Sequence, residues 1–252
     1  MYQNFIYYNI NTKVCSKDIY QLGFQIFSAL GLVIKSIGEI KMDNNLNLQL
    51  KEYNDKVYFE KNVLTNDTSF RLNNLDRMTE RLTFGYNSGK IELVSNINIC
   101  IALDQFNEHE LKIIKEILDR FHQYTYAISF KTQNIFDAFE YFHGQSFINL
   151  YPYEQSYLWE ESLNNDYFQN GDFRKQIRLV YEDNYIEPTF LETMIDNQKL
   201  ISIISQDKNL GTIKQLSSNL YYWKVEEEKL EMVNNFLGEN GLLVSYDSSF
   251  LK

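Results

Sequence analysis

Two acid-x-x-His steps are the nearest approach in this sequence to a metal-binding pattern. They are Asp119-Arg-Phe-His122 and Glu140-Tyr-Phe-His143. Carboxylate-bridged dimetal sites use such steps on two facing helices of a bundle, with a further Glu from each of two other helices. Here the two expected helices flank a strand, and each His should close its helix, where an imidazolium offsets the helix dipole. We therefore expect no metal site.

Two other short patterns have only part of a catalytic or nucleotide-binding motif. Gly85-Tyr-Asn-Ser-Gly89-Lys90 is one residue short of a phosphate loop and leads into a strand, so we interpret it as a hairpin turn. Ser205-Gln-Asp-Lys208 has the Ser-x-x-Lys spacing of acyl-enzyme hydrolases, but the accompanying Lys-Thr-Gly element is absent. A polar turn explains it. The sequence therefore predicts no cofactor.

Paired carboxylates remain open as catalytic groups. With 34 Asp and Glu in the chain, some pair always comes within about 5–10 Å, the separation used by two-carboxylate hydrolases. A Ser-His-acid triad is neither found nor excluded, because its members are assembled in space rather than in sequence. A hydrolase with paired carboxylates in a cleft between the two halves of the chain is the alternative to the binding function developed below.

The first half of the chain predicts a helix, a series of short strands and a second helix. Residues 16–30 have apolar positions on one helical face, with Ser16 as the expected cap. Short β-prone runs follow at 33–41, 46–50 and 56–60, and a long central strand is expected over 90–103. Asn107-Glu-His-Glu110 resembles a capping box and begins a helix. A strand at 124–130 would complete a compact β-α-β unit around 97–131.

The second half continues the alternation less regularly. We expect helices near 134–143, 188–196 and 226–237, and strands at 176–182, 199–205, 219–225 and 241–246. Residues 144–175 fit neither period and are interpreted as a long ordered loop, which is often functional. The predicted fold class is α+β, a mixed β-sheet with several packed helices. With 2 Pro and 10 Gly there is little linker material, so residues 1–252 predict one compact domain.

The net charge divides the chain into two lobes. Residues 1–131 contain 15 Lys and Arg and 15 Asp and Glu, so this lobe is neutral. Residues 132–252 contain 9 Lys and Arg against 19 Asp and Glu, which gives the whole net charge of −10. Negative potential repels nucleic acid and the anionic cytoplasmic leaflet, and it attracts a basic protein. The alternative is that the acids serve solubility alone.

Aromatic residues are concentrated in the same acidic lobe. Residues 136–190 contain 15 of the 39 Phe, Tyr and Trp of the chain. Phe136, Phe139 and Phe142 have helical spacing and are expected in the core. The aromatic residues of irregular chain, from Tyr151 to Trp159, are better candidates for contact with a partner, because Tyr and Trp are enriched at interfaces.

In composition and organisation the chain resembles the immunity proteins that bacteria keep in the cytoplasm against toxins of contact-dependent or secretion-delivered competition. It is acidic and α+β, it has no catalytic signature, and its N-terminus lacks the pattern of a signal peptide. The resemblance implies a non-enzymatic protein that neutralises a basic toxin by occluding it. The partner-binding residues it implies are Tyr151, Tyr153, Tyr157, Trp159, Glu160, Glu161, Asp166, Tyr167 and Asp172.

Three further expectations accompany this interpretation. Cys15 and Cys100 are far apart and make no C-x-x-C pair, so both are expected as reduced thiols in a cytoplasmic protein. No stretch approaches 18 uninterrupted apolar residues, so membrane spanning is not expected. A structural or assembly protein of phage or mobile-element origin is the third functional hypothesis, and the oligomeric state is left open.

Overall fold

The structure, a computed structural model, describes residues 1–10, 13–42, 48–74, 81–89, 94–134, 137, 141 and 148–249. It divides into two compact units, Met1–Tyr124 (unit 1) and Thr125–Lys252 (unit 2). Both units combine antiparallel β-structure with packed helices. The predicted α+β fold class is confirmed.

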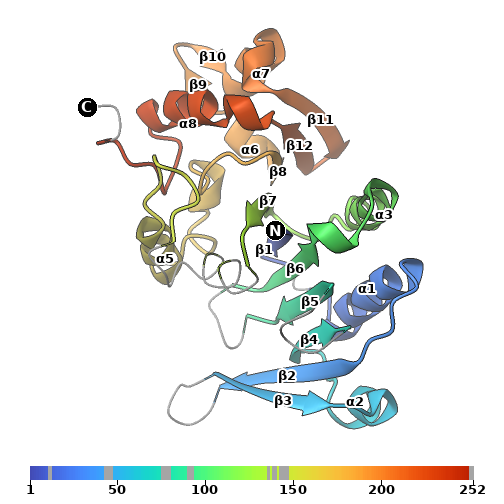
Figure 1. Cartoon of the computed structure of the whole chain (residues 1–252). Helices are drawn as coiled ribbons and strands as arrows, with labels where there is room; N and C mark the ends of the chain where they lie inside the picture. Colours follow the sequence, from blue (N-terminus) through green and yellow to red (C-terminus); the bar gives the residue numbers. More distant parts are fainter. Residues whose placement is uncertain are drawn as a thin grey trace. The chain divides into compact units, whose positions relative to one another are not determined.

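Unit 1 contains an antiparallel sheet in the order β3-β2-β4-β5-β6-β1 (Figure 1). Its strands are β1 (Tyr2–Tyr8), β2 (Ser36–Met42), β3 (Leu48–Tyr53), β4 (Ser69–Asn73), β5 (Leu82–Asn87) and β6 (Asn96–Ala102). β6 pairs with both β1 and β5, and its Ile97, Ile99 and Ile101 are at most 1% exposed. The expected central strand is therefore present, although it begins at Asn96 rather than Lys90.

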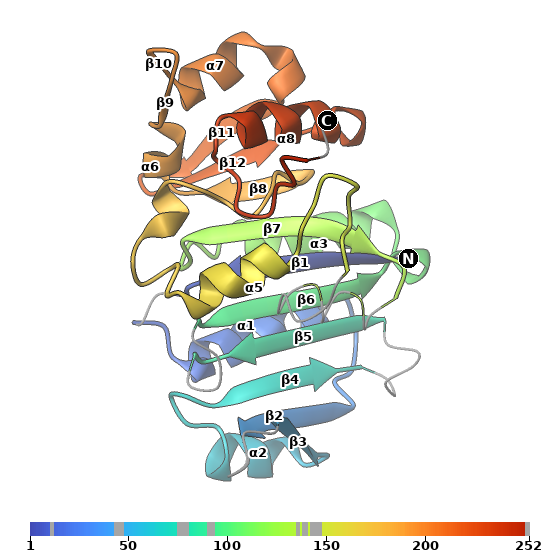
Figure 2. The ribbon, with the colours of Figure 1, turned by 90° about the vertical axis from the view of Figure 1, so that its left-hand side faces the viewer.

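The helices of unit 1 are α1 (Ser16–Ala29), α2 (Lys56–Asn62), the 3-10 turn η1 (Leu103–Gln105) and α3 (Glu108–Leu118). α1 and α3 lie on the same face of the sheet (Figures 1 and 2). A Cβ at Gly23 of α1 would stand 2.8 Å from the side chains of Leu72 and Phe84, so glycine allows this helix to approach β4 and β5 closely. Both helices were expected from the sequence, and the capping box of Asn107 with Glu110 is confirmed, whereas the N-cap of α1 is Cys15 rather than the expected Ser16.

Unit 2 contains an antiparallel sheet in the order β7-β8-β12-β11. Its strands are β7 (Tyr126–Thr132), β8 (Asp183–Ile186), β11 (Thr212–Ser217) and β12 (Leu220–Lys224), and β9 (Met194–Ile195) pairs separately with β10 (Gln198–Lys199). The helices are α5 (Tyr157–Asn164), α6 (Pro188–Leu191), α7 (Leu200–Gln206) and α8 (Leu230–Glu239). Three 3-10 turns join them, η2 (Asp172–Arg174), η3 (Lys208–Leu210) and η4 (Glu227–Lys229). Figures 1 and 2 both show α7 beside the β9 and β10 hairpin.

Two stretches expected as strands are helices. Residues 56–60 belong to α2, whose cap Asp55 accepts a hydrogen bond from the Tyr58 amide at 2.9 Å. Residues 200–205 belong to α7, where Leu200 and Ile204 are buried one turn apart. Short apolar runs fit either period, and burial of one helical face decides these two cases.

Two other expected strands, 176–182 and 241–246, form isolated bridges, Ile177 with Leu243 and Glu154 with Tyr246. Some backbone groups that would pair in a β-ladder are hydrogen-bonded to side chains instead. The Val180 amide, for example, donates to Asn234 Oδ1 at 2.9 Å. Residues 144–175 were expected to be irregular, and within them the structure places α5 and η2. β1, β4, β5, β8 and β11 were not expected from the sequence, and the helix expected near 188–196 ends at Leu191, before β9.

The expected strand, helix and strand of 97–131 occur in order as β6, α3 and β7. The boundary between the two units falls inside this stretch, after Tyr124, so β7 belongs with unit 2. Charge follows the same division. Unit 1 has 14 Lys and Arg and 15 Asp and Glu, a net charge of −1, and unit 2 has 10 against 19, a net charge of −9. In the part of the chain that the structure describes, no helix has the length and apolar character needed to cross a membrane.

Candidate partner-binding site

The candidate site is the outer face of helix α5 in unit 2. Tyr157, Glu160 and Glu161 are three and four residues apart and therefore share one side of the helix. Tyr157 is 46% exposed, Glu161 is exposed and Glu160 is half-buried. We call these three residues the α5 face. Asp166 follows shortly after the helix and is exposed, with its backbone in the left-handed region at φ 59°.

Trp159 anchors the opposite side of α5 in the core. Its side chain is fully buried, with ring centroids 5.0 Å from Tyr167, 6.2 Å from Tyr126 and 6.3 Å from Phe168. The Arg178 guanidinium lies over the indole at 5.7 Å. Contacts of this kind hold the helix so that the α5 face points away from the core.

The expectation that all the predicted contact residues lie on the surface is wrong for three of them. Trp159, Tyr153 and Tyr167 are at most 2% exposed. Tyr153 Oη accepts a hydrogen bond from Asn234 Nδ2 at 3.4 Å, and Tyr167 Oη donates to the Gln176 carbonyl. An aromatic residue in irregular chain can pack inward as well as outward, and here the packing between rings outweighs exposure.

The remaining predicted residues are partly or wholly exposed. Tyr151 is half-buried and stacks on Tyr153, with ring centroids 5.3 Å apart. Burial raises the pKa of Tyr151, which therefore stays neutral. Asp172 is half-buried and lies 4.0 Å from Lys175 Nζ. Of the nine predicted residues, the structure brings Tyr157, Glu160 and Glu161 onto one outward surface.

Several acids of unit 2 are held in ion pairs, and those of the α5 face are not. Lys131 Nζ pairs with Glu182 at 3.2 Å and with Glu227 at 3.0 Å. Other cations pair with Glu187, Asp172 and Glu192. Among the described residues, Glu160, Glu161 and Asp166 have no such cation within 4.0 Å. Their charges remain available to a basic partner.

A buried ion pair beside α5 is the site feature that sequence reasoning missed. Glu154 Oε1 and Arg178 Nη2 are 3.4 Å apart, and both side chains are fully buried. Tyr141 Oη donates to Glu154 Oε1 at 2.6 Å, and Arg178 Nη1 donates to the Tyr141 carbonyl at 2.7 Å. Burial raises the pKa of Glu154, while Arg178 opposes that shift. A signal existed in Ile177-Arg178-Leu179-Val180, because a cation inside an apolar run needs a buried partner.

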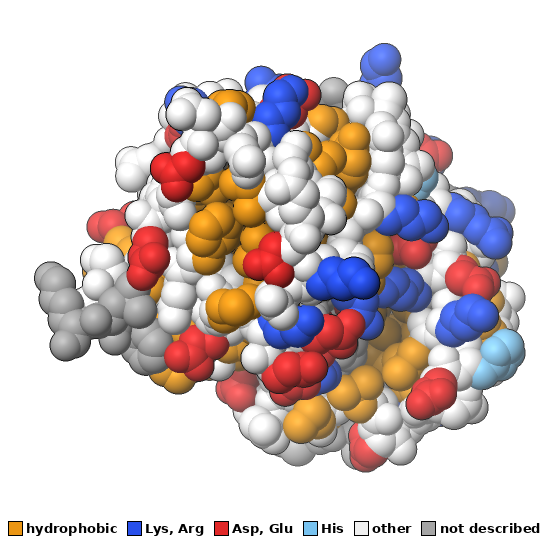
Figure 3. All heavy atoms as spheres, turned by 90° about the horizontal axis from the view of Figure 1, so that it is seen from above, with side chains coloured by type: hydrophobic (Ala, Val, Ile, Leu, Met, Phe, Trp, Pro, Cys, Tyr) orange, Lys and Arg blue, Asp and Glu red, His pale blue; other side chains and the backbone are white. Residues whose placement is uncertain are grey.

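The side of unit 2 that carries α7 is seen from above in Figure 3. Acidic and basic side chains are interspersed there with hydrophobic ones.

Among the described residues considered for other chemistry, Asp119 and Ser205 take part in helix structure. Asp119 caps α3, so His122 lies beyond the helix end, and Glu140 and His143 lie outside the described residues, as do Phe136, Phe139 and Phe142. Ser205 Oγ donates to the Ile201 carbonyl at 2.7 Å. Within the described residues, no three His, Cys, Asp or Glu are grouped to hold a metal ion.

Gly85 lies inside strand β5 rather than in a hairpin turn, and Gly89, just beyond that strand, has a φ of +80°. A Cβ at Gly85 would stand 2.4 Å from Asn98 Oδ1, its partner in β6. Close approach of the two strands therefore explains this glycine. Lys90 lies outside the described residues.

Comparison with known proteins gives a similarity of fold. No family model matches the chain, and no curated protein matches its sequence. The solved structure of the Pseudomonas aeruginosa T6SS protein PA0821 is similar, with a TM-score of 0.59 and 8% sequence identity. The similarity covers 96% of this chain and 73% of that one. The two chains therefore share a fold over nearly the whole length of this protein.

Proposed function

We propose that this chain is a non-enzymatic binding protein of the immunity type, which neutralises a basic toxin by occluding it. The observation that carries the proposal is the α5 face, where an exposed tyrosine stands beside two carboxylates that form no ion pair with any described residue. Exposed aromatic residues and unpaired charges are the groups that gain most from a complementary partner.

The charge of unit 2 supports a basic partner. Its net charge of −9 attracts a cationic protein over distances comparable to the Debye length, about 10 Å at 0.1 M salt. Attraction of this kind raises the rate of association more than it lengthens the life of the complex. The aromatic contact of Tyr157 would act on dissociation, because burial of an anchor side chain holds the complex together.

The structural neighbour supports the biological setting. That protein is described as a T6SS protein, and the family that this chain resembles in composition protects bacteria against toxins of contact-dependent or secretion-delivered competition. A shared fold extends to this chain the hypothesis of a partner from such a system, although fold by itself does not carry function.

The experiment measures binding between this protein and the product of the adjacent gene in its source genome. In surface plasmon resonance, Glu160→Lys with Glu161→Lys should slow association several-fold at low salt, because charge steering accelerates encounter. Tyr157→Ala should mainly accelerate dissociation. Rising salt should slow association of the wild type, and the charge-reversed protein should lose that dependence. In cells that express the toxic partner, co-expression of the wild-type protein should restore growth. Co-expression of the variants should restore growth less.

The matched control is Glu239→Lys with Glu231→Lys on α8, which reverses the same number of exposed charges away from α5. If the control slows association as strongly as the α5 variant, the α5 face is not the docking surface. If no basic protein binds while small substrates are hydrolysed, the paired-carboxylate hydrolase replaces this proposal. If this protein is instead incorporated into a phage-like particle, that result would favour a structural or assembly protein of phage or mobile-element origin.

A further inference from the structure

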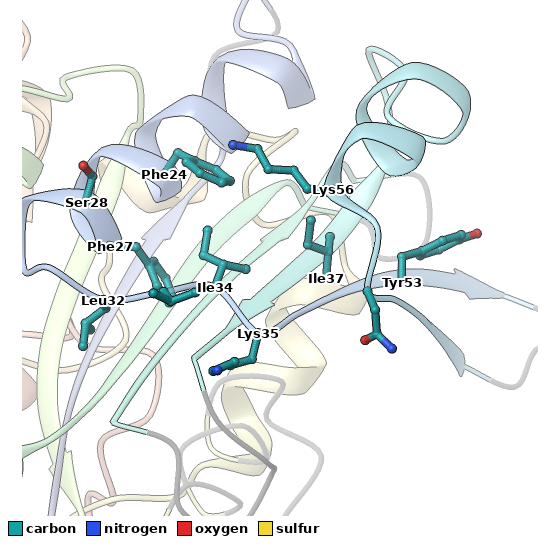
Figure 4. Close-up of a pocket in the computed structure, with 11 residues that line it drawn as sticks. Phe24, Phe27, Ser28, Leu32, Ile34, Lys35, Ile37, Tyr53 and Lys56 are labelled. Atoms are coloured by element: carbon teal, nitrogen blue, oxygen red, sulfur yellow. The ribbon is translucent and has the colours of Figure 1, made fainter.

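A hollow of about 330 Å³ opens on unit 1, far along the chain from α5. It lies between α1, the segment leading into β2, and the loop from β3 to α2 (Figure 4). Its volume falls at the lower end of the range of small-molecule sites, about 300–1,000 Å³.

Apolar side chains form most of its wall. They are Phe24, Phe27, Leu32, Val33, Ile34 and Ile37, together with the ring of Tyr53. Val33 is 67% exposed, the largest exposed fraction among the large hydrophobic side chains of the described residues. Covering such a surface removes apolar area from water and so favours an apolar occupant.

The charged side chains that line the hollow are both lysines. Lys56 Nζ stands 3.4 Å from the centroid of the Phe24 ring, and its other neighbour is Glu60 at 3.7 Å. Lys35 is exposed and has no ion pair among the described residues. Figure 4 shows the two lysines on opposite sides of Ile34. An occupant with a negative group would therefore meet a cation at either margin.

We propose that this hollow binds a small amphiphilic anion, an apolar body with a carboxylate or sulfonate group. The apolar body would contact Phe24, Ile34 and Val33, and the anionic group would pair with Lys35 or Lys56. In an apolar pocket, a small number of polar groups fixes the orientation of the ligand. The ligand is a free molecule rather than a lipid within a bilayer, because the hollow is about the size of one short acyl chain or aromatic system.

The test uses 8-anilinonaphthalene-1-sulfonate, a fluorescent aromatic anion, as the probe. The full-length folded protein should bind it saturably with one site, and decanoate should displace it. Decanol and decylammonium have the same chain without the negative charge, so they should displace it more weakly. Lys35→Gln with Lys56→Gln should weaken binding by roughly three- to ten-fold, since each exposed pair contributes modestly. Val33→Asp should weaken it further by placing a carboxylate on the wall.

Lys112→Gln is the matched control, because it removes an exposed lysine of α3 that does not line the hollow. Equal binding by the double lysine variant and the control would overturn the proposal, as would equal displacement by decylammonium. Binding to anionic phospholipid vesicles without binding of free decanoate would also overturn it. The charge-reversed α5 variant should bind the probe normally, so failure here and failure of the immunity function give different results.

Discussion

At the scale of single residues, neighbouring positions in the acidic segment have opposite roles. Trp159 and Tyr157 are two residues apart, yet the first is fully buried and the second is 46% exposed. A helix turns by about 100° per residue, so adjacent aromatic residues on α5 cannot all face the same way. Burial therefore assigns Trp159 to stability and leaves Tyr157 for contact.

Replacement of Trp159 by Ala should destabilise the protein by about 3–5 kcal/mol, the usual cost of removing a buried aromatic side chain. Packing against Tyr126, Tyr167 and Phe168 is lost, and a cavity remains. Urea denaturation measures the change. Tyr157→Ala is the control and should change the free energy of unfolding by less than about 0.5 kcal/mol. Equal effects of the two substitutions would contradict the assignment.

The buried Glu154 carboxyl predicts a pH dependence of stability. Burial raises its pKa above the ordinary 4.5, so the folded state binds this proton more tightly than the unfolded state. Below the pKa of the unfolded state the carboxyl is protonated in both states, so its ionisation does not change the free energy of unfolding. As pH rises from that pKa toward the higher pKa of the folded state, the free energy of unfolding falls. The free energy of unfolding of the wild type should therefore fall relative to that of Glu154→Gln as pH rises above about 4.5.

Urea denaturation of both proteins over about pH 4–8 measures that difference, which should change by at most about 1.4 kcal/mol per pH unit. The two proteins should be most alike near pH 4, where the carboxyl of Glu154 is protonated and, like the amide of the variant, carries no charge. A difference that rises with pH would mean that attraction to Arg178 outweighs the effect of burial.

At the scale of elements, Gly211 allows two backbone segments to approach closely at the start of the β11 and β12 hairpin. Gly211 precedes β11 with φ +97°, and a Cβ there would stand 2.2 Å from the backbone carbonyl oxygen of Lys224. A side chain at this position therefore meets two obstacles, a left-handed backbone and a rigid neighbour. The residue after Gly211, Thr212, is paired with Lys224 in the β11 and β12 ladder.

Gly211→Ala should destabilise unit 2 by about 2 kcal/mol or more, because backbone strain alone costs about 1–3 kcal/mol and the clash adds to it. Gly241→Ala is the control. Gly241 also has a positive φ, +69°, but a Cβ there would have nothing within 4 Å. Thermal unfolding should show the larger loss for Gly211→Ala, and equal losses would show that the clash relaxes without cost.

At the scale of the whole molecule, the two units are joined without a linker. Unit 1 ends at Tyr124, and β7 of unit 2 begins at Tyr126. The chain has 2 Pro and 10 Gly, so the expectation from the sequence is one cooperative domain. That expectation remains a prediction.

The two tryptophans make it testable, because Trp159 and Trp223 are both in unit 2 and the chain contains 2 in all. Tryptophan fluorescence therefore reports the unfolding of unit 2, and far-ultraviolet circular dichroism reports both units. The two urea transitions should coincide if the chain unfolds as one unit. A dichroism transition that continues after the fluorescence change is complete would show independent unfolding.

The sequence by itself determined the features that depend on local pattern. Regular periodicity predicted α1, α3, β6 and β12, the succession of helical and strand patterns predicted the α+β class, and composition predicted the acidic second half. These features follow from which side chains recur at a helical or strand period, which neighbouring residues already specify.

Tertiary structure alone decided which face of each element is covered. Residues 56–60 and 200–205 could be strand or helix by pattern, and burial of Phe59, Leu200 and Ile204 made them helices. The acidic aromatic segment could not be divided into core and surface, because Trp159 is buried by Tyr126 and Arg178, which come from distant parts of the chain. Local spacing does not specify the contacts between residues that are far apart in sequence. Only the tertiary structure therefore identifies the α5 face as the outward side of this helix.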